Sequence, residues 1–283
     1  EKQLIVSGML DVVDSALIVN TYGGDRTLEI SWSESSSSFR VPGLAQGGYG
    51  FAQGKDGSLY SGLHARGIRR FDPSGLRSEF IPFTKEDKVY ESGALIPFID
   101  STGKVWVGLE NGLGYVDTLD DKIHYVEDLT ILKNARLNGV SAAFNSGYFW
   151  LATSVGAFLF DPYLERIIED IPKLRNREVV SVRQFNQDSV WMLPIEGAVY
   201  LWQKQTDTWD SLSIFKSEWQ NNLHDVLPDE RGVLWFPSNN GLIRYDPFKK
   251  DFIRLSTLPF GLPFNDVTIF SRRALSAQSF PFL

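Results

Sequence analysis

One phrase occurs twice in this sequence, at positions 100–117 and 229–246, and it constrains the fold more than any other feature. Both copies begin with Asp, carry Gly at the fourth position and Trp at the seventh, and end with Asp. The Trp marks a repeat whose successive copies lie roughly 43 residues apart. In chain order the marker positions are Ile18, Tyr60, Trp106, Trp150, Trp191 and Trp235.

Each unit contains short apolar segments, such as 105–107 and 199–201, separated by Gly, Asn, Asp and Pro. These segments are too short for helices and are rich in β-branched and aromatic residues, so they indicate four strands per unit. A four-stranded unit of this period predicts an all-β fold, a β-propeller of antiparallel blades. We expect seven blades with an incomplete seventh, and six closed blades as the alternative. The predicted single domain, 1–283, divides into blades at about 1–42, 43–85, 86–132, 133–175, 176–217, 218–260 and the partial 261–283.

The repeated residues are expected to have structural roles. The aromatic markers should fill the space between neighbouring blades, where they bury a large apolar area. The Gly that follows the second strand should adopt positive φ or allow close backbone approach. The Asp that follows the third strand should form an Asx-type turn. The Gly positions are Gly67, Gly112, Gly156, Gly197 and Gly241, and the Asp positions are Asp72, Asp117, Asp161 and Asp246.

Charge and composition exclude several functions. The chain has 28 Lys plus Arg against 35 Asp plus Glu, a net charge of −7, and no long basic run. It therefore lacks the basic surface that binds nucleic acid. No apolar run approaches the length of a spanning helix, so we expect no membrane contact from this segment, and its first residues have no signal-peptide pattern. Cysteine is absent, which removes thiol catalysis and Cys-ligated metals but leaves the compartment open.

The phrases at 229–246 and 100–117 resemble the two-component-regulator propeller repeat, and 67–72 and 261–267 resemble parts of it. This resemblance implies a periplasmic or otherwise extracytoplasmic sensor, the input part of membrane-bound histidine kinases, hybrid regulators or diguanylate cyclases. It also implies a homodimer in the full-length context. Because the second ring, sandwich and membrane helix of that family do not follow, we expect an excised segment or a truncated relative.

No catalytic constellation or cofactor motif is recognisable, so we expect no enzyme activity, no cofactor and no metal. The three histidines, His64, His124 and His224, show no metal-ligand spacing. The alternative is a propeller lyase or hydrolase acting on a polysaccharide or cyclic ester. Residues 232–236 resemble a virginiamycin-lyase phrase, and Glu110 and Glu196 occupy equivalent loops that could face each other.

Binding is the favoured hypothesis. In propellers, the loops between second and third strands open on one face around the channel, and their polar groups could hydrogen-bond a ligand. We expect the ligand to be an oligosaccharide or other small molecule, or the partner to be a protein. Longer connections at 84–90, 129–138 and 216–219, with Trp219, are further candidates. The candidate ligand-binding residues are His64, Arg66, Glu110, Asn111, Glu196, Asn239 and Asn240.

Overall fold

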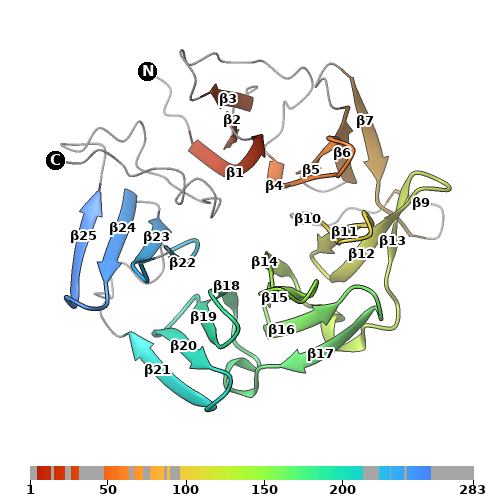
Figure 1. The fold of residues 1–283 in the computed structure, drawn as a ribbon. Helices are drawn as coiled ribbons and strands as arrows, with labels where there is room; N and C mark the ends of the chain where they lie inside the picture. Colours follow the sequence, from red (N-terminus) through yellow and green to blue (C-terminus); the bar gives the residue numbers. More distant parts are fainter. Residues whose placement is uncertain are drawn as a thin grey trace. The chain divides into compact units, whose positions relative to one another are not determined.

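The computed structural model is drawn in Figure 1. It describes residues 5–13, 16–22, 27–31, 48–63, 67–72, 77–85, 88–89, 96–212, 223–229, 231–238 and 241–255. The chain divides into two compact units, one of residues 48–221 and one that combines residues 1–47 with 222–283. Each unit is described by itself.

The larger unit contains four four-stranded antiparallel sheets, each with its strands in chain order. The first two sheets are β4 (Gly48–Gln53), β5 (Leu59–Leu63), β6 (Gly67–Phe71) and β7 (Ser78–Pro82), and then β10 (Ile96–Ile99), β11 (Val105–Leu109), β12 (Gly112–Asp117) and β13 (Lys122–Tyr125). The next two are β14 (Leu137–Ala142), β15 (Phe149–Thr153), β16 (Gly156–Asp161) and β17 (Arg166–Asp170), and then β18 (Val179–Gln184), β19 (Ser189–Pro194), β20 (Val199–Gln203) and β21 (Thr208–Leu212).

The connections between the sheets of this unit contain small elements of their own. A two-stranded hairpin of β8 (Thr84–Lys85) and β9 (Lys88–Val89) lies between the first two sheets in the chain. Single-turn 3-10 helices η1 (Thr130–Leu132) and η2 (Pro172–Leu174) precede the third and fourth sheets. In the part of the chain that the structure describes, no helix is long and apolar enough to cross a bilayer.

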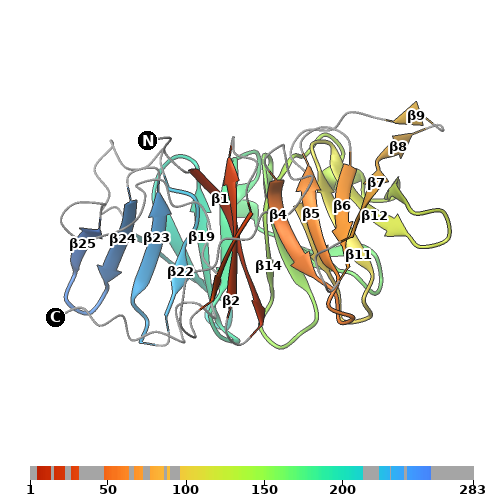
Figure 2. The ribbon, with the colours of Figure 1, turned by 90° about the horizontal axis from the view of Figure 1, so that it is seen from above.

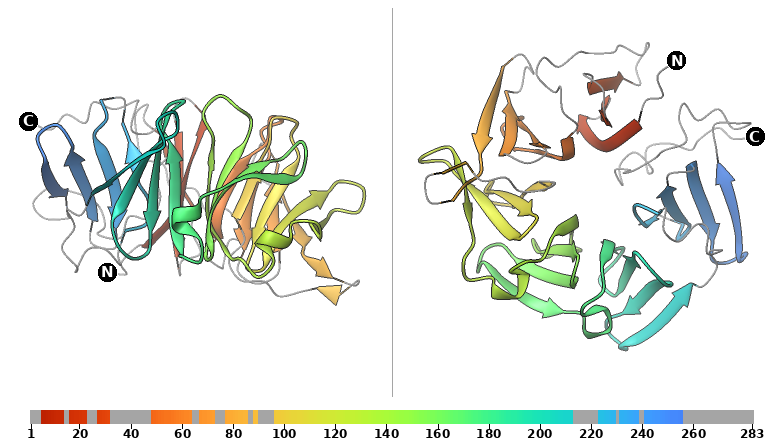
Figure 3. Two further views of the ribbon diagram at one scale, coloured as in Figure 1. Left: turned by 90° about the horizontal axis from the view of Figure 1, so that it is seen from below. Right: turned by 180° about the vertical axis from the view of Figure 1, so that it is seen from behind.

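The first strands of the four sheets contact one another in succession, β4 with β10, β10 with β14 and β14 with β18. These strands lie on the inner side of the unit, and the later strands of each sheet lie further out (Figure 3, right). Figure 2 shows the neighbouring sheets of this unit side by side. The turns between first and second strands therefore lie at the opposite end of each sheet from the turns between second and third strands.

Among the described residues of this unit, the hydrophobic core forms three clusters, each shared by two consecutive sheets. Tyr60 packs with Val105 and Val107 of the next sheet. Trp106 packs with Phe158 and Phe160, and its ring centroid lies 5.0 Å from that of Phe160. Trp150 packs with residues of the fourth sheet, Val182, Met192 and Trp202. The expected role of the aromatic markers between neighbouring blades is thus confirmed at these three positions.

Polar contacts also join neighbouring sheets. The Nδ2 of Asn138 donates to the carbonyl oxygen of Val179 over 2.9 Å, and the Oγ of Ser141 donates to that of Val182 over 2.6 Å. Both pairs link β14 to β18. Gly139 lies between the two donors, where a Cβ atom would sit 2.9 Å from the main-chain oxygen of Val180. Close packing of the two backbones therefore requires glycine here.

The expected turns after the third strands are present. Asp117 Oδ1 accepts from the amide of Leu119, Asp161 Oδ1 from those of Tyr163 and Leu164, and Asp246 Oδ1 from those of Phe248 and Lys249. These aspartates stabilise turns, as the repeat pattern indicates.

The Asp that opens the repeat has a second role. Asp100 Oδ1 accepts from the amides of Thr102, Gly103 and Lys104, and its Oδ2 accepts from the indole of Trp106. In the smaller unit, Asp229 binds Trp235 in the same way.

The smaller unit contains a three-stranded and a four-stranded antiparallel sheet. They are β1 (Ile5–Val13), β2 (Ala16–Tyr22) and β3 (Thr27–Ser31), and β22 (Leu227–Pro228), β23 (Leu234–Ser238), β24 (Gly241–Asp246) and β25 (Asp251–Leu255). The described residues thus form five four-stranded sheets, each within one predicted blade, and the predicted first blade has three described strands. Residues 261–283 lie outside the described residues, so the seventh blade and the single-domain boundary stay predictions.

Candidate functional site

Glu110 and Asn111 form the turn between β11 and β12, and both are exposed. The hydroxyl of Tyr125 donates to the main-chain oxygen of Asn111 over 2.7 Å, and burial raises the pKa of Tyr125, so this donor stays protonated. Gly112 follows with a φ of +126°, a backbone conformation that favours glycine. The turn is therefore fixed through its backbone while its two side chains face solvent.

Glu196 lies in the equivalent turn between β19 and β20 and is exposed. Arg177 holds this turn, because its Nη2 donates to the main-chain oxygen of Glu196 over 2.8 Å and its Nη1 donates to the hydroxyl of Tyr200 over 3.2 Å. The guanidinium carbon of Arg177 also lies 5.7 Å from the centroid of the Tyr200 ring.

Glu110 and Glu196 belong to different sheets, and the β14–β17 sheet lies between them in the chain. The other predicted site residues, His64, Arg66, Asn239 and Asn240, lie outside the described residues, as does Trp219. The predicted ring of polar loop residues is thus described at three positions, and its role in binding stays a prediction.

A polar cluster that the sequence did not reveal lies between the third and fourth sheets. The guanidinium of Arg136 donates to Glu178 and to Asn138 Oδ1, and Asn138 Nδ2 also reaches Glu178 Oε1 at 3.3 Å. The amide of Arg136 donates to Ser154 Oγ over 3.0 Å. Because these groups satisfy one another, the cluster joins two sheets at the end where the Glu196 turn lies. Its only sequence signal is an Arg-x-Asn segment that begins a first strand.

Three potential metal ligands lie together although their spacing in the sequence indicated none. Asp117, Asp120 and His124 each place one ligand atom within 4.8 Å of the others. His124 Nε2 lies 2.9 Å from Asp120 Oδ2. Burial opposes ionisation of Asp120, but the hydrogen bond and charge of His124 outweigh it and lower the pKa of Asp120. The Oδ1 atoms of Asp117 and Asp120 accept from the turn amides of Leu119 and Lys122, so turn formation accounts for the proximity of the three groups.

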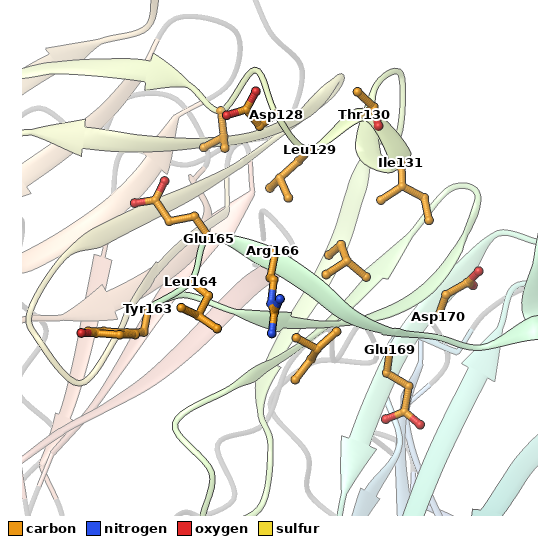
Figure 4. Close-up of a pocket in the computed structure, with 13 residues that line it drawn as sticks. Asp128, Leu129, Thr130, Ile131, Tyr163, Leu164, Glu165, Arg166, Glu169 and Asp170 are labelled. Carbon is orange, nitrogen blue, oxygen red and sulfur yellow. The ribbon is translucent and has the colours of Figure 1, made fainter.

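A groove of about 850 Å³ runs along the outer edge strand β17. In Figure 4, residues 128–131 lie along one side of this groove and residues 163–170 along the other. Its acidic side chains are mostly paired, since Glu165 binds Lys104, Glu169 binds Lys204 and Asp170 binds Arg175. Large apolar side chains are exposed beside them, including Tyr163 at 84% and Leu164 at 51%.

No protein-family model matches the sequence, and no curated protein matches it. Solved structures do resemble the fold. The extracellular domain of BT3049 from B. thetaiotaomicron, described as a hybrid two-component system, is 16% identical with a TM-score of 0.67 over 90% of this chain. This chain spans about a third of that protein, 34% of its length.

Two further solved structures are similar. Virginiamycin B lyase from Staphylococcus aureus is 14% identical, with a TM-score of 0.68 over 93% of this chain and 89% of its own. The WD40 β-propeller domain of Doa1 is 13% identical, with a TM-score of 0.67 over 92% of this chain and 84% of its own. At these identities the likeness shows the fold and leaves the activity open. The chain is thus a β-propeller whose structural neighbours include extracellular domains of two-component systems, consistent with the resemblance of its repeats to the two-component-regulator propeller family.

Proposed function

We propose that this propeller is a non-enzymatic binding domain, the extracytoplasmic input part of a bacterial two-component or cyclic-nucleotide signalling protein. The observation that carries the proposal is the direction in which the pKa values of the carboxyl groups are shifted. Among the described residues, the carboxyl groups with a shifted pKa are Asp56, Asp100, Asp120 and Asp246, and each is shifted downward. A general acid requires the opposite shift at neutral pH.

The turns that carry exposed polar side chains support the same proposal. Glu110, Asn111 and Glu196 lie on turns whose main chains are fixed by Tyr125 or Arg177. A rigid turn that presents exposed polar side chains lowers the entropic cost of binding a ligand. The likeness to the extracellular domain of BT3049 supports an extracytoplasmic setting for this domain.

The alternative is a lyase related to virginiamycin B lyase. A lyase variant with one histidine replaced by alanine is described as catalytically inactive, so that enzyme requires a histidine. In this chain His124 lies on the edge strand β13, stacks on Tyr115 at 6.0 Å between centroids and binds Asp120 of its own turn. That environment favours a structural role for His124.

The test combines binding and activity on the full chain. Thermal unfolding is measured with neutral oligosaccharides, acidic oligosaccharides, amino acids and tripeptides. In parallel, virginiamycin B is incubated with the protein and examined for ring opening by reversed-phase chromatography with tandem mass spectrometry, because opening by elimination leaves the mass unchanged. A ligand at about 100 times its Kd stabilises by roughly 2.7 kcal/mol, which raises Tm by several degrees. We expect such a shift for one class and no ring opening. Ring opening above the buffer control, or no shift with any class, would contradict the proposal.

A protein-binding role is the second candidate, favoured by the exposed apolar side chains of the β17 groove. An unpaired edge strand beside such side chains can accept an added strand from a partner. Replacing Leu164 with Ser should then weaken association with that partner. The matched control is Leu119→Ala, which removes a 93% exposed side chain outside the groove.

A further inference from the structure

A second pocket, of about 600 Å³, lies between the third and fourth sheets. Its wall comes from three turns, those between β14 and β15, between β18 and β19, and between β20 and β21. Strand β19 runs from one of these turns to the turn that carries Glu196, so the pocket lies at the opposite end of the sheet from the predicted loop residues.

The pocket lies beside a unit that lacks the Asp found in the units of Trp106 and Trp235, as the units of Tyr60 and Trp191 also do. Asp100 and Asp229 each stand six residues before a Trp and bind its indole. The equivalent residue before Trp150 is Phe144, whose side chain is 38% exposed. The missing acceptor is supplied by Gln184 of the next sheet, whose Oε1 accepts from Trp150 Nε1 over 3.0 Å and from the amide of Phe144 over 3.2 Å. An aromatic side chain thus faces solvent where the fold requires only a turn-forming Asp.

The pocket offers amide groups that the fold does not use. Gln184 is fully engaged, since its Nε2 also donates to the main-chain oxygen of Gln187. The side-chain amides of Asn145, Gln187 and Gln205 make no hydrogen bond within the described part of the chain. Gln187 and Gln205 are exposed and contribute only main-chain atoms to the turns. Each free amide can both donate and accept.

The pocket also has no unpaired charge among its lining residues. Among its lining residues only Lys204 is charged, and its Nζ binds Glu169 over 3.0 Å and lies 5.4 Å from the centroid of Trp150. No carboxylate lines the pocket, so it lacks the pair of acids that glycoside cleavage requires. A charged ligand would find no unpaired counter-charge here.

From these observations we infer that this pocket binds a neutral oligosaccharide through one or two of its sugar units. Sugar hydroxyls both donate and accept hydrogen bonds, which suits the amides of Asn145, Gln187 and Gln205. The apolar face of a sugar ring suits the rings of Phe144 and Tyr148, and the pocket volume lies in the range of small-molecule sites. The inference names the ligand class for the proposed binding function and rests on it.

The test is isothermal titration calorimetry of the full chain with four neutral hexasaccharides, of cellulose, xylan, starch and chitin type, and with trigalacturonic acid as the acidic comparison. Three variants remove pocket groups, Phe144→Ala, Gln187→Ala and Gln205→Ala, and each leaves the main-chain hydrogen bonds in place. Leu119→Ala is the matched control for loss of an exposed apolar side chain. Glu196→Ala reports on the opposite end of the sheet and keeps the main-chain contact with Arg177.

We expect saturable binding of a neutral hexasaccharide, weakened about tenfold by Phe144→Ala and severalfold by each Gln variant, and unchanged in Leu119→Ala. Binding of none of the neutral sugars, or undiminished binding in all three pocket variants, would overturn the inference. Binding that is lost only in Glu196→Ala, or binding of the acidic sugar or a peptide alone, would overturn it too but leave the proposed binding function standing. If no ligand of any class binds, both this inference and the proposed binding function are contradicted.

Discussion

The indole Nε1 of Trp106 donates a 2.9 Å hydrogen bond to Oδ2 of Asp100, the residue that opens the same repeat. The other carboxylate oxygen of Asp100 holds the turn between β10 and β11 through three amides. One side chain therefore sets both the shape of the turn and the orientation of the aromatic ring that packs against the next sheet. Asp229 makes the same contact with Trp235, so two of the units share this arrangement.

Replacing Asp100 with Ala should lower the free energy of unfolding by roughly 3 kcal/mol, because it leaves a buried indole and three turn amides without an acceptor. Asp117→Ala is the matched control. It removes a turn acceptor that contacts one amide, and should cost about 1 kcal/mol. Urea unfolding followed by tryptophan fluorescence measures both. Equal losses would show that the indole contact contributes nothing.

The same carboxylate predicts an acid dependence of stability. Burial opposes ionisation of Asp100, but hydrogen bonds from Thr102, Trp106 and Lys104 outweigh it and lower its pKa below the ordinary value of 3.8. The folded state therefore binds fewer protons than the unfolded state. The stabilisation is complete above pH 3.8 and is lost as the pH falls through the folded pKa. Unfolding measured at several pH values between 6 and 2.5 should show a shallower decline for Asp100→Asn than for the unmodified protein, and identical slopes would refute this assignment.

Replacing Trp150 with Ala should cost about 3–5 kcal/mol, since the side chain is fully buried between the third and fourth sheets. Leu119→Ala, at a 93% exposed position, should change the free energy of unfolding by less than about 0.5 kcal/mol. Chemical denaturation with circular dichroism compares the two. A small effect at Trp150 would mean that the two sheets do not depend on this ring.

Two glycines should respond differently to a single added methyl group. At Gly67 a Cβ would lie 2.2 Å from the main-chain oxygen of Ile81, so Gly67→Ala must displace β6 from β7. Gly103 has open space around it and a φ of +98°, so Gly103→Ala should cost only about 1 kcal/mol of backbone strain. Comparison of their melting temperatures tests this, and the larger fall is expected for Gly67→Ala.

The repeat made the sheet architecture predictable, because Trp106 and its equivalents recur at one spacing and the residues between them suit short strands. The bond between Asp100 and Trp106 could not be anticipated in the same way. The spacing from Asp to Trp occurs twice in the sequence, but only the shape of the turn brings a carboxylate oxygen to the indole nitrogen.

The candidate site was less predictable than the sheets, because part of it depends on contacts between neighbouring repeats. Glu110, Asn111 and Glu196 were identifiable because their turns have fixed places in the repeat. Phe144 stands where two other units have Asp. Its turn is held by Gln184, which lies 40 residues further along the chain and belongs to the next sheet. A pocket formed by turns of neighbouring repeats has no local signature.

The packing of the aromatic markers has a consequence for synthesis. Trp106 and Trp150 hold their positions partly through their own sheets, but each ring is covered by the sheet that follows it in the chain. During translation, the second and third sheets of the larger unit therefore each present a bare aromatic face until the next repeat leaves the ribosome. Chaperones that recognise exposed aromatic surface should engage this chain repeatedly, once for each sheet that awaits its successor.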